Sequence, residues 1–216
     1  KHGLLKIETA LQEDRGDMKG MLKNLRPIEL MNISEREEGS IITKDGALSY
    51  LTGDHTGRSP NAKFIVYDNL SKDKICWENN NKISQGEFDE YYKKFLFFKN
   101  NAQKVYHQEV SAVRDPDYVL DIDIYTEFAK HSLFVRNMFI PEQEQAREFK
   151  GCYTIYHFPS MYDKPIVLIS LEKRVILISG THYSGEIKKS IFTVLNYWLP
   201  ESWGFLPMHC SVNVDK

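Results

Sequence analysis

The nine residues THYSGEIKK, at positions 181–189, join a strongly apolar stretch to an amphipathic one. Residues 175–179 before them are typical of a buried β-strand, and residues 185–199 after them predict a helix. Tyr183 and Gly185 mark the turn between these two elements. A strand that leads through a short turn into a helix indicates a fold in which strands and helices are mixed.

The rest of the sequence extends this mixed pattern. Residues 166–171 and 175–179, joined by Glu172-Lys173-Arg174, predict a hairpin. Ser84 and Glu87 form a capping box that begins a helix with an aromatic stripe. We predict further strands at 64–67, 105–113, 118–124, 153–158 and 206–214, a hairpin at 41–52, and helices at 27–36 and 126–139. Because the order is irregular, we predict an α/β (mixed α+β) fold with a mixed β-sheet flanked by helices.

Size and composition narrow the possible functions. The chain has 216 residues, of which 42% are hydrophobic, so it can bury a sizeable core. Its net charge of −2 argues against a nucleic-acid partner. No apolar run reaches the ~20 residues that span a bilayer, so we expect no membrane partner. The three cysteines have no zinc spacing and are odd in number, which favours a reducing compartment.

The N-terminal residues differ from the remainder in pattern. Residues 1–25 are charged and predict a loosely helical arm, broken near Gly16. The chain begins without Met and without a signal-peptide pattern, which suggests that it starts inside a longer protein. We therefore separate an N-terminal helical arm, residues 1–25, from a main domain, residues 26–216.

Arg58 is the first candidate for chemistry. It lies in the loop TGRSP at residues 56–60, between two predicted strands. Gly57 would let the backbone approach a ligand, and the planar guanidinium of Arg58 suits a carboxylate or phosphate. The alternative is a solvated turn in which a carboxylate holds Arg58, and a lone arginine in a turn favours that interpretation.

The lysine pair Lys188 and Lys189 is the second candidate. Cations are unfavourable near a helix N-terminus, where the helix dipole already places positive charge. Two lysines there suggest a bound anion, and crowding by cations favours a neutral lysine that can act as a base or a metal ligand. Two solvated lysines explain this segment equally well.

His209 is the third candidate. It lies among apolar residues of the strand predicted at 206–214, so we expect it to be largely buried. A lone histidine on such a strand is more commonly a structural residue, and a metal would need ligands from elsewhere. His157 and His182 have no partner at metal-ligand spacing and are interpreted as structural. No GxxxxGK[ST] or GxGxxG loop occurs in the sequence.

Together these segments resemble the N-terminal domain of ATP-dependent phosphoenolpyruvate carboxykinase. The resemblance is carried by collinear motifs: DGAL at 45–48, TGRSP at 56–60 with KFIV at 63–66, FVRNMFI at 134–140, GTxYxGExKK at 180–189 and MHCSxNV at 208–214. It covers residues 26–216 and implies the oxaloacetate-side domain of such an enzyme. The C-terminal P-loop domain of the family has no counterpart in this sequence.

The resemblance implies roles for five residues. Arg58 matches the arginine that holds the substrate carboxylate, and Tyr183 the tyrosine beside the substrate and the CO2 site. Lys189 matches a neutral lysine ligand of Mn²⁺, and His209 a histidine ligand of the same ion, on the side of the ATP phosphates. Lys188 matches a neighbouring lysine that contributes positive potential.

The same resemblance implies the reaction and its cofactors. The family converts oxaloacetate and ATP to phosphoenolpyruvate, ADP and CO2 in gluconeogenesis, with Mn²⁺ at the active site and Mg²⁺ on the nucleotide. A cytoplasmic location and a C-terminal P-loop domain as partner are also implied. This chain alone, with about half of such a site, is expected to be inactive.

Several positions depart from the family pattern. In the segment after Arg58, Ala62 replaces an acid that is usual in the family. The family usually has an arginine between the isoleucine and the proline, whereas here Pro141 follows Ile140 directly. Asp215 stands where a glycine is usual. None of these is a carried-over site residue. They leave open an alternative, in which the chain is a diverged, non-catalytic binding or assembly module with the same fold.

Overall fold

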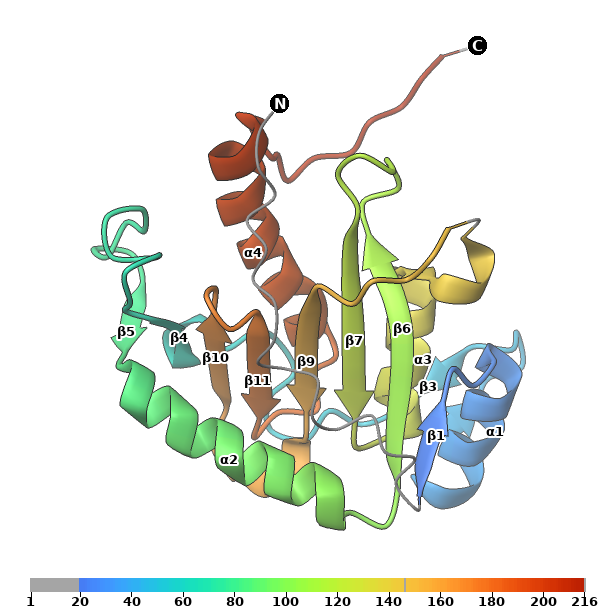
Figure 1. The fold of residues 1–216 in the computed structure, drawn as a ribbon. Helices are drawn as coiled ribbons and strands as arrows, with labels where there is room; N and C mark the ends of the chain where they lie inside the picture. Colours follow the sequence, from blue (N-terminus) through green and yellow to red (C-terminus); the bar gives the residue numbers. More distant parts are fainter. Residues whose placement is uncertain (1–19, 146, 216) are drawn as a thin grey trace.

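The computed structural model describes residues 20–145 and 147–215, and its centre is a nine-stranded mixed β-sheet (Figure 1). The strand order is β1-β6-β7-β9-β11-β10-β4-β5, with β8 paired to β6. The strands are β1 (Met21–Lys23), β4 (Lys63–Val66), β5 (Asn81–Ile83), β6 (Val105–Ala112), β7 (Leu120–Thr126), β8 (Ile140–Pro141), β9 (Tyr153–His157), β10 (Ile166–Ser170) and β11 (Val175–Ser179).

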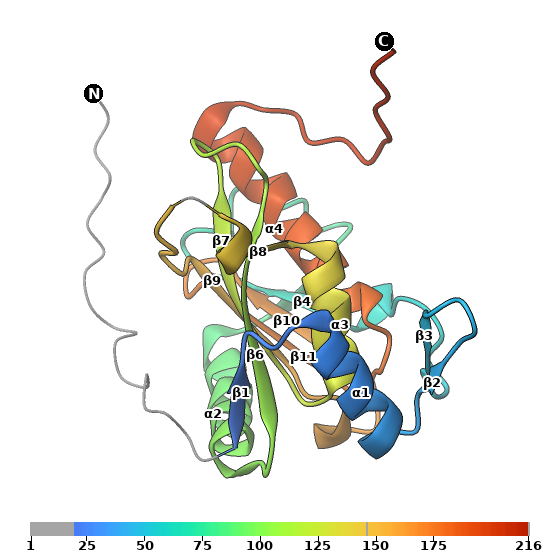
Figure 2. The same ribbon diagram turned by 90° about the vertical axis from the view of Figure 1, so that its right-hand side faces the viewer.

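Helices cover both faces of this sheet, as the edge-on view in Figure 2 makes clear. On one face α2 (Gln85–Asn101) buries Phe88 and Phe95 against the sheet. On the other face α4 (Gly185–Trp203) packs through an apolar stripe that includes Ile187, Ile191 and Val194. Helix α3 (Ala129–Met138) shares this second face, and α1 (Pro27–Glu37) packs on α3. The sheet strands are apolar on both sides because both sides are covered.

The predicted mixed sheet flanked by helices is confirmed. Strands β10 and β11 pair antiparallel as a hairpin, as do β6 and β7, whereas β9 pairs in parallel with β7 and β11. The capping box is also present, since the Ser84 hydroxyl accepts the Glu87 N–H at 3.2 Å and the Glu87 carboxylate accepts the Ser84 N–H at 3.1 Å. The hairpin predicted at 41–52 forms as β2 (Ile41–Ile42) and β3 (Leu48–Ser49).

The predicted helical arm over residues 1–25 is wrong for its final part, and residues 1–19 lie outside the described residues. Residues 21–23 form β1, in parallel register with β6. Asn24 secures this edge strand, because its side chain both donates to Glu109 and accepts the Glu109 N–H. Long-range pairing with a strand therefore overrides the local helical pattern of this short segment.

The strand predicted at 206–214 is wrong as well. Residues 204–215 have no regular secondary structure and run away from the end of α4 (Figure 1). His209, expected to be largely buried, is exposed. An isolated strand leaves its backbone N–H and C=O groups unpaired, so alternating apolar residues form a strand only beside another strand. No described strand lies beside this segment.

Two helix boundaries differ from the sequence prediction. Helix α3 begins at Ala129 rather than at residue 126, because Thr126 still belongs to β7. The carboxylate of Glu38 accepts the backbone N–H groups of Ala129 and Lys130 and so supplies the missing cap from a distant segment. Helix α4 continues past Pro200 to Trp203 and ends at Gly204, whose left-handed conformation (φ 69°) suits glycine.

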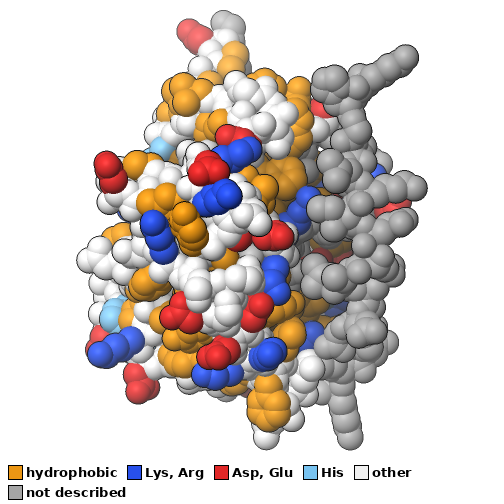
Figure 3. Space-filling model, turned by 60° about the vertical axis from the view of Figure 1, so that its left-hand side comes forward, with side chains coloured by type: hydrophobic (Ala, Val, Ile, Leu, Met, Phe, Trp, Pro, Cys, Tyr) orange, Lys and Arg blue, Asp and Glu red, His pale blue; other side chains and the backbone are white. Residues whose placement is uncertain are grey.

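The charge distribution of the surface agrees with the balanced composition. The face in Figure 3 shows lysine and arginine side chains interspersed with aspartate and glutamate, without a continuous basic stripe. Within the described ranges, no helix combines the length and apolar character that a membrane crossing needs.

Candidate functional site

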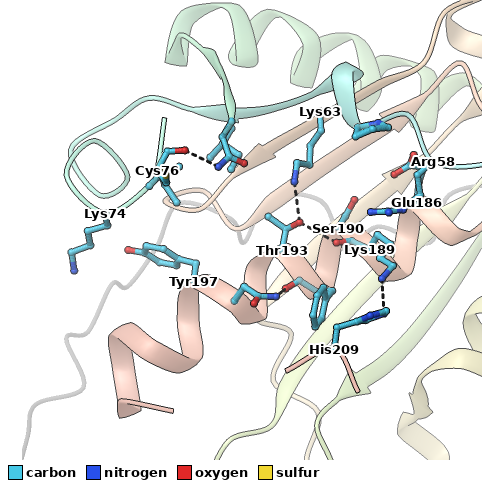
Figure 4. A pocket seen from close by; sticks show the side chains of 16 residues that line it. Arg58, Lys63, Lys74, Cys76, Glu186, Lys189, Ser190, Thr193, Tyr197 and His209 are labelled. Atoms are coloured by element: carbon cyan, nitrogen blue, oxygen red, sulfur yellow. Dashed lines mark hydrogen bonds between the residues drawn. The ribbon is translucent and has the colours of Figure 1, made fainter. Parts of the chain in front are cut away.

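A pocket beside α4 gathers three of the predicted site residues (Figure 4). Arg58 and Lys63 enter it from the segment that ends in β4, and Glu186 and Lys189 from the first turns of α4. His209 reaches it from the tail after α4. The pocket therefore combines residues that are more than 150 positions apart in the sequence.

Lys189 and His209 point toward one another in this pocket (Figure 4). The Nζ atom of Lys189 lies 2.9 Å from Nε2 of His209. The ring of Phe192, one turn further along α4, packs against the His209 ring with centroids 5.4 Å apart. Contacts from α4 thus hold His209, although the tail that carries it is exposed.

Arg58 lies on an exposed loop that is tied to α4 at a single point. The backbone N–H of Ser59 donates to Oε1 of Glu186 at 2.5 Å. Glu186 is only 6% exposed, and it is the second residue of α4. This hydrogen bond places the Arg58 loop beside the helix that carries Lys189.

Lys63 is a further cation of the pocket to which the sequence analysis assigned no role. It is half-buried, and its Nζ lies 3.4 Å from the hydroxyl of Thr193 on α4. Burial lowers the pKa of Lys63, while the charge of Glu186 opposes that shift and the charge of Arg58 adds to it. A lysine at the start of an apolar strand, within KFIV, is the only sequence signal that could have revealed it.

Tyr183 lies in an adjacent pocket, between the hairpin β2–β3 and the start of α4. Tyr50, which follows β3, forms a 2.6 Å hydrogen bond with Ser184 that fixes the hairpin here. Gly185 leaves room for the Tyr183 ring, since a Cβ on Gly185 would lie 2.4 Å from its Cε1 atom. Lys188 is exposed and lies outside both pockets. The structure thus unites Arg58, Lys189 and His209 and keeps Tyr183 and Lys188 apart from them.

Lys189 and His209 lie at the distance of a hydrogen bond, and the same distance is compatible with two ligands of one metal ion. Two nitrogen ligands at about 2.1 Å from one ion, at right angles, are about 3.0 Å apart. The observed separation of 2.9 Å agrees with such a pair. Two ligands are fewer than a protein metal site needs, and within residues 20–145 and 147–215 no group of three His, Cys, Asp or Glu ligands includes His209.

Another group, His107, Glu109 and Asp123, has ligand atoms within 4.8 Å of one another. It lies on the opposite face of the sheet, because these residues alternate with Val110, Ile122 and Ile124 of the α4-side core. Lys23 forms an ion pair with Glu109 at 2.8 Å, and His107 bonds Asp123 at 2.8 Å. These charges are already paired within the protein, so the group is explained without a metal.

Three histidines, His131, His157 and His182, pack behind the turn that carries Tyr183, and the burial of His157 agrees with its structural interpretation. His157 and His131 are fully buried, and their Nε2 atoms lie 3.0 Å from the carbonyls of Thr181 and His182. Burial lowers the pKa of His157 to about 3 and that of His131 well below its usual value. These rings support the backbone of the turn as neutral side chains.

The fold and this pocket define an α/β domain with a cluster of lysine and arginine side chains beside α4. Residues 19–216 match the family described as phosphoenolpyruvate carboxykinase. A relative from Rhizobium rhizogenes, phosphoenolpyruvate carboxykinase (ATP), is 40% identical over 88% of this chain and 37% of its own length. The enzyme of the same name from Caldanaerobacter subterraneus is 36% identical over 93% of this chain and 40% of its own length.

A further relative of that name, from Shouchella clausii, is 43% identical over 83% of this chain and 36% of its own length. The chain belongs to the ATP-dependent phosphoenolpyruvate carboxykinase family. It spans well under half the length of these relatives.

Proposed function

We propose that residues 26–216 form the oxaloacetate-side half of an ATP-dependent phosphoenolpyruvate carboxykinase. The observation that carries the proposal is the 2.9 Å separation of the Lys189 and His209 nitrogens, in one pocket with Arg58. In this proposal Lys189 and His209 are two ligands of one Mn²⁺ ion, and the other ligands come from the remainder of a complete enzyme.

The chemistry assigns a task to each side chain. Loss of CO2 from oxaloacetate leaves an enolate, and Mn²⁺ would stabilise the negative charge that develops on it. The guanidinium of Arg58 would hold a substrate carboxylate through two parallel hydrogen bonds. Tyr183, in the adjacent pocket, would border the substrate and the departing CO2, and the exposed Lys188 would add positive potential.

Transfer of the γ-phosphoryl group needs further parts. ATP and its Mg²⁺ require a loop of backbone amides to cradle the phosphates, and these 216 residues contain no GxxxxGK[ST] sequence. We therefore expect the nucleotide to bind a C-terminal P-loop domain, and we expect residues 1–216 alone to have no carboxykinase activity with oxaloacetate, ATP and Mn²⁺. A cytoplasmic location is part of the same proposal.

Calorimetry with oxalate, a stable analogue of the enolate, tests the site. We expect oxalate to bind only with Mn²⁺ present, and Lys189→Ala to abolish this binding. Lys188→Ala is the comparison variant. Because Lys188 lies outside the pocket, its loss should weaken oxalate binding less than the loss of Lys189 does, and the effect should become smaller as the salt concentration is raised. Equal losses in the two variants would contradict the assignment of Lys189 as a ligand.

The same titration addresses the alternative of a non-catalytic module. Its basis is the incomplete ligand set, since Lys189 and His209 supply only two of the groups that a metal requires. Absence of Mn²⁺-dependent oxalate binding, both in the chain and in a protein extended to the length of its relatives, would favour the module.

A further inference from the structure

Glu186 is a buried carboxylate at the edge of the pocket, and its environment is unusual. It is 6% exposed and lies in the first turn of α4, where the helix dipole favours negative charge. Burial of a carboxylate is costly unless hydrogen bonds and opposite charges compensate it. The N–H of Ser59 supplies the hydrogen bond, at 2.5 Å, and Lys63 and Arg58 supply the charges in the same pocket.

The loop between Tyr50 and Ser59 is fixed by a hydrogen bond at each end, from Tyr50 to Ser184 and from Ser59 to Glu186. Within the part of the chain that the structure describes, residues 51–58 make no hydrogen bond to another element of the fold. Arg58 is exposed, and no carboxylate forms an ion pair with it there. The hydrogen bond from Ser59 to Glu186, adjacent to Arg58 in the chain, is therefore the nearest point at which this loop is fixed to the rest of the protein.

We propose that Glu186 is a positioning residue, whose carboxylate fixes the Ser59 amide and thereby holds Arg58 beside Lys189. The inference rests on the proposed function, because it gives Arg58 the task of holding a substrate anion. Without the tie, the loop would have to be ordered when the anion binds, and the entropy of ordering would weaken binding. A hydrogen bond to a charged acceptor is about twice as strong as a neutral one, which explains why a carboxylate serves this purpose.

The charge of Glu186 has a second consequence for the pocket. Four cations line it, Arg58, Lys63, Lys74 and Lys189. Lys74 forms an ion pair with Glu201, and the other three repel one another as like charges. Glu186 offsets part of that repulsion, and its effect on Lys63 is visible in the opposing contribution to the pKa of that lysine. Because one oxygen of the Glu186 carboxylate accepts the Ser59 N–H, this negative charge is held at the edge of the pocket, where it partly compensates the positive charges.

Hydrogen exchange of the Arg58 loop tests the tie without a ligand. Glu186→Met keeps the side-chain volume but removes the oxygen, and Glu186→Gln keeps an oxygen without charge. We expect the hydrogen-bonded amides of Ser59 and Ala62 to exchange about tenfold faster or more in Glu186→Met and at an intermediate rate in Glu186→Gln. Ser59→Ala, which retains the N–H, should exchange as the unchanged protein does. Far-UV circular dichroism verifies that each variant is folded.

The second measurement is oxalate affinity with Mn²⁺. We expect Glu186→Met to weaken it about tenfold, and Glu186→Gln to restore most of the loss although the charge is gone. Unchanged exchange of the Ser59 and Ala62 amides in both Glu186 variants would overturn the proposal. If Glu186→Met does not fold, Glu186→Gln alone decides the point. Faster exchange in a protein that binds no oxalate would support the tie and contradict the proposed function.

Discussion

Gly180 shows how a single residue fixes the turn between β11 and the site. It adopts a left-handed conformation with φ 69°, and a Cβ there would lie 2.0 Å from the backbone oxygen of Lys164. Neither the conformation nor the contact can be relieved by a side-chain movement. We expect Gly180→Ala to lower the free energy of unfolding by about 2 kcal/mol or more, measured by urea denaturation.

A matched control comes from α2. Gly86 lies in the first turn of that helix, has an ordinary φ and has open space around its Cβ position. Gly86→Ala should stabilise the protein by about 0.5–1 kcal/mol, because alanine reduces the entropy of the unfolded chain. Equal stabilities of the two variants would show that the turn at Gly180 tolerates a side chain.

The buried histidines predict a pH dependence of stability. Their pKa values in the folded protein lie below the unfolded value of about 6.5, with that of His157 at about 3. Between these limits the unfolded chain binds more protons, so stability is complete above pH 6.5 and falls as the pH is lowered. The expected loss is about 1.4 kcal/mol per pH unit for each fully buried histidine.

Urea denaturation at pH 7.0, 6.0 and 5.5 measures this slope, in a range where most carboxyl groups stay ionised. In His157→Gln the free energy of unfolding should fall less steeply with decreasing pH than in the unchanged protein, whatever the stability of the variant at pH 7.0. The same pH dependence in the variant would mean that His157 does not contribute to the loss of stability at low pH. Because His157 and His131 bond the carbonyls of Thr181 and His182, protonation of these buried rings is expected to destabilise the turn that carries Tyr183.

Glu38 shows how one element can depend on another that is distant in the sequence. It follows α1 and caps the N-terminus of α3 by accepting two backbone N–H groups, while Ser34 donates to the same carboxylate. Glu38→Ala would leave those amides unpaired, so we expect a loss of about 1–3 kcal/mol in the free energy of unfolding. Glu35→Ala, on the exposed side of α1, is the control and should change stability by less than about 0.5 kcal/mol.

Elements with a local signal were predictable from the sequence. The capping box of α2 and the β10–β11 hairpin carry their determinants within a few residues. The sequence predicted helix α3 but not its first residue, because the cap comes from the distant Glu38. Strand β1 was not predicted, because it forms only by pairing with β6. The same distinction applies to the site: motifs identified Arg58, Lys189 and His209, whereas the buried tie from Glu186 depends on packing that the sequence does not display.

Among the described residues, the tail after α4 exposes several large apolar side chains. Leu206 is 83% exposed, Met208 68% and Val214 92%, on the tail that also carries His209. Exposed apolar residues in sequence alternation are typical of a strand that lacks its neighbour. We expect them to be covered in a complete carboxykinase, where the sequence beyond residue 216 could supply that neighbour.

Deletion of residues 206–216 tests this view of the molecule. Phe205, which packs on Tyr118, is retained, so the deletion removes little buried surface from the domain. The free energy of unfolding of the 205-residue chain should therefore stay within about 0.5 kcal/mol of the original, while Mn²⁺-dependent oxalate binding should be lost with His209. The deletion in a protein of full family length should cost several kcal/mol, about the value of burying two or three large apolar side chains. A large loss in the short chain would show that the tail packs against this domain. No loss in the long chain would show that the remainder of the enzyme does not cover the tail.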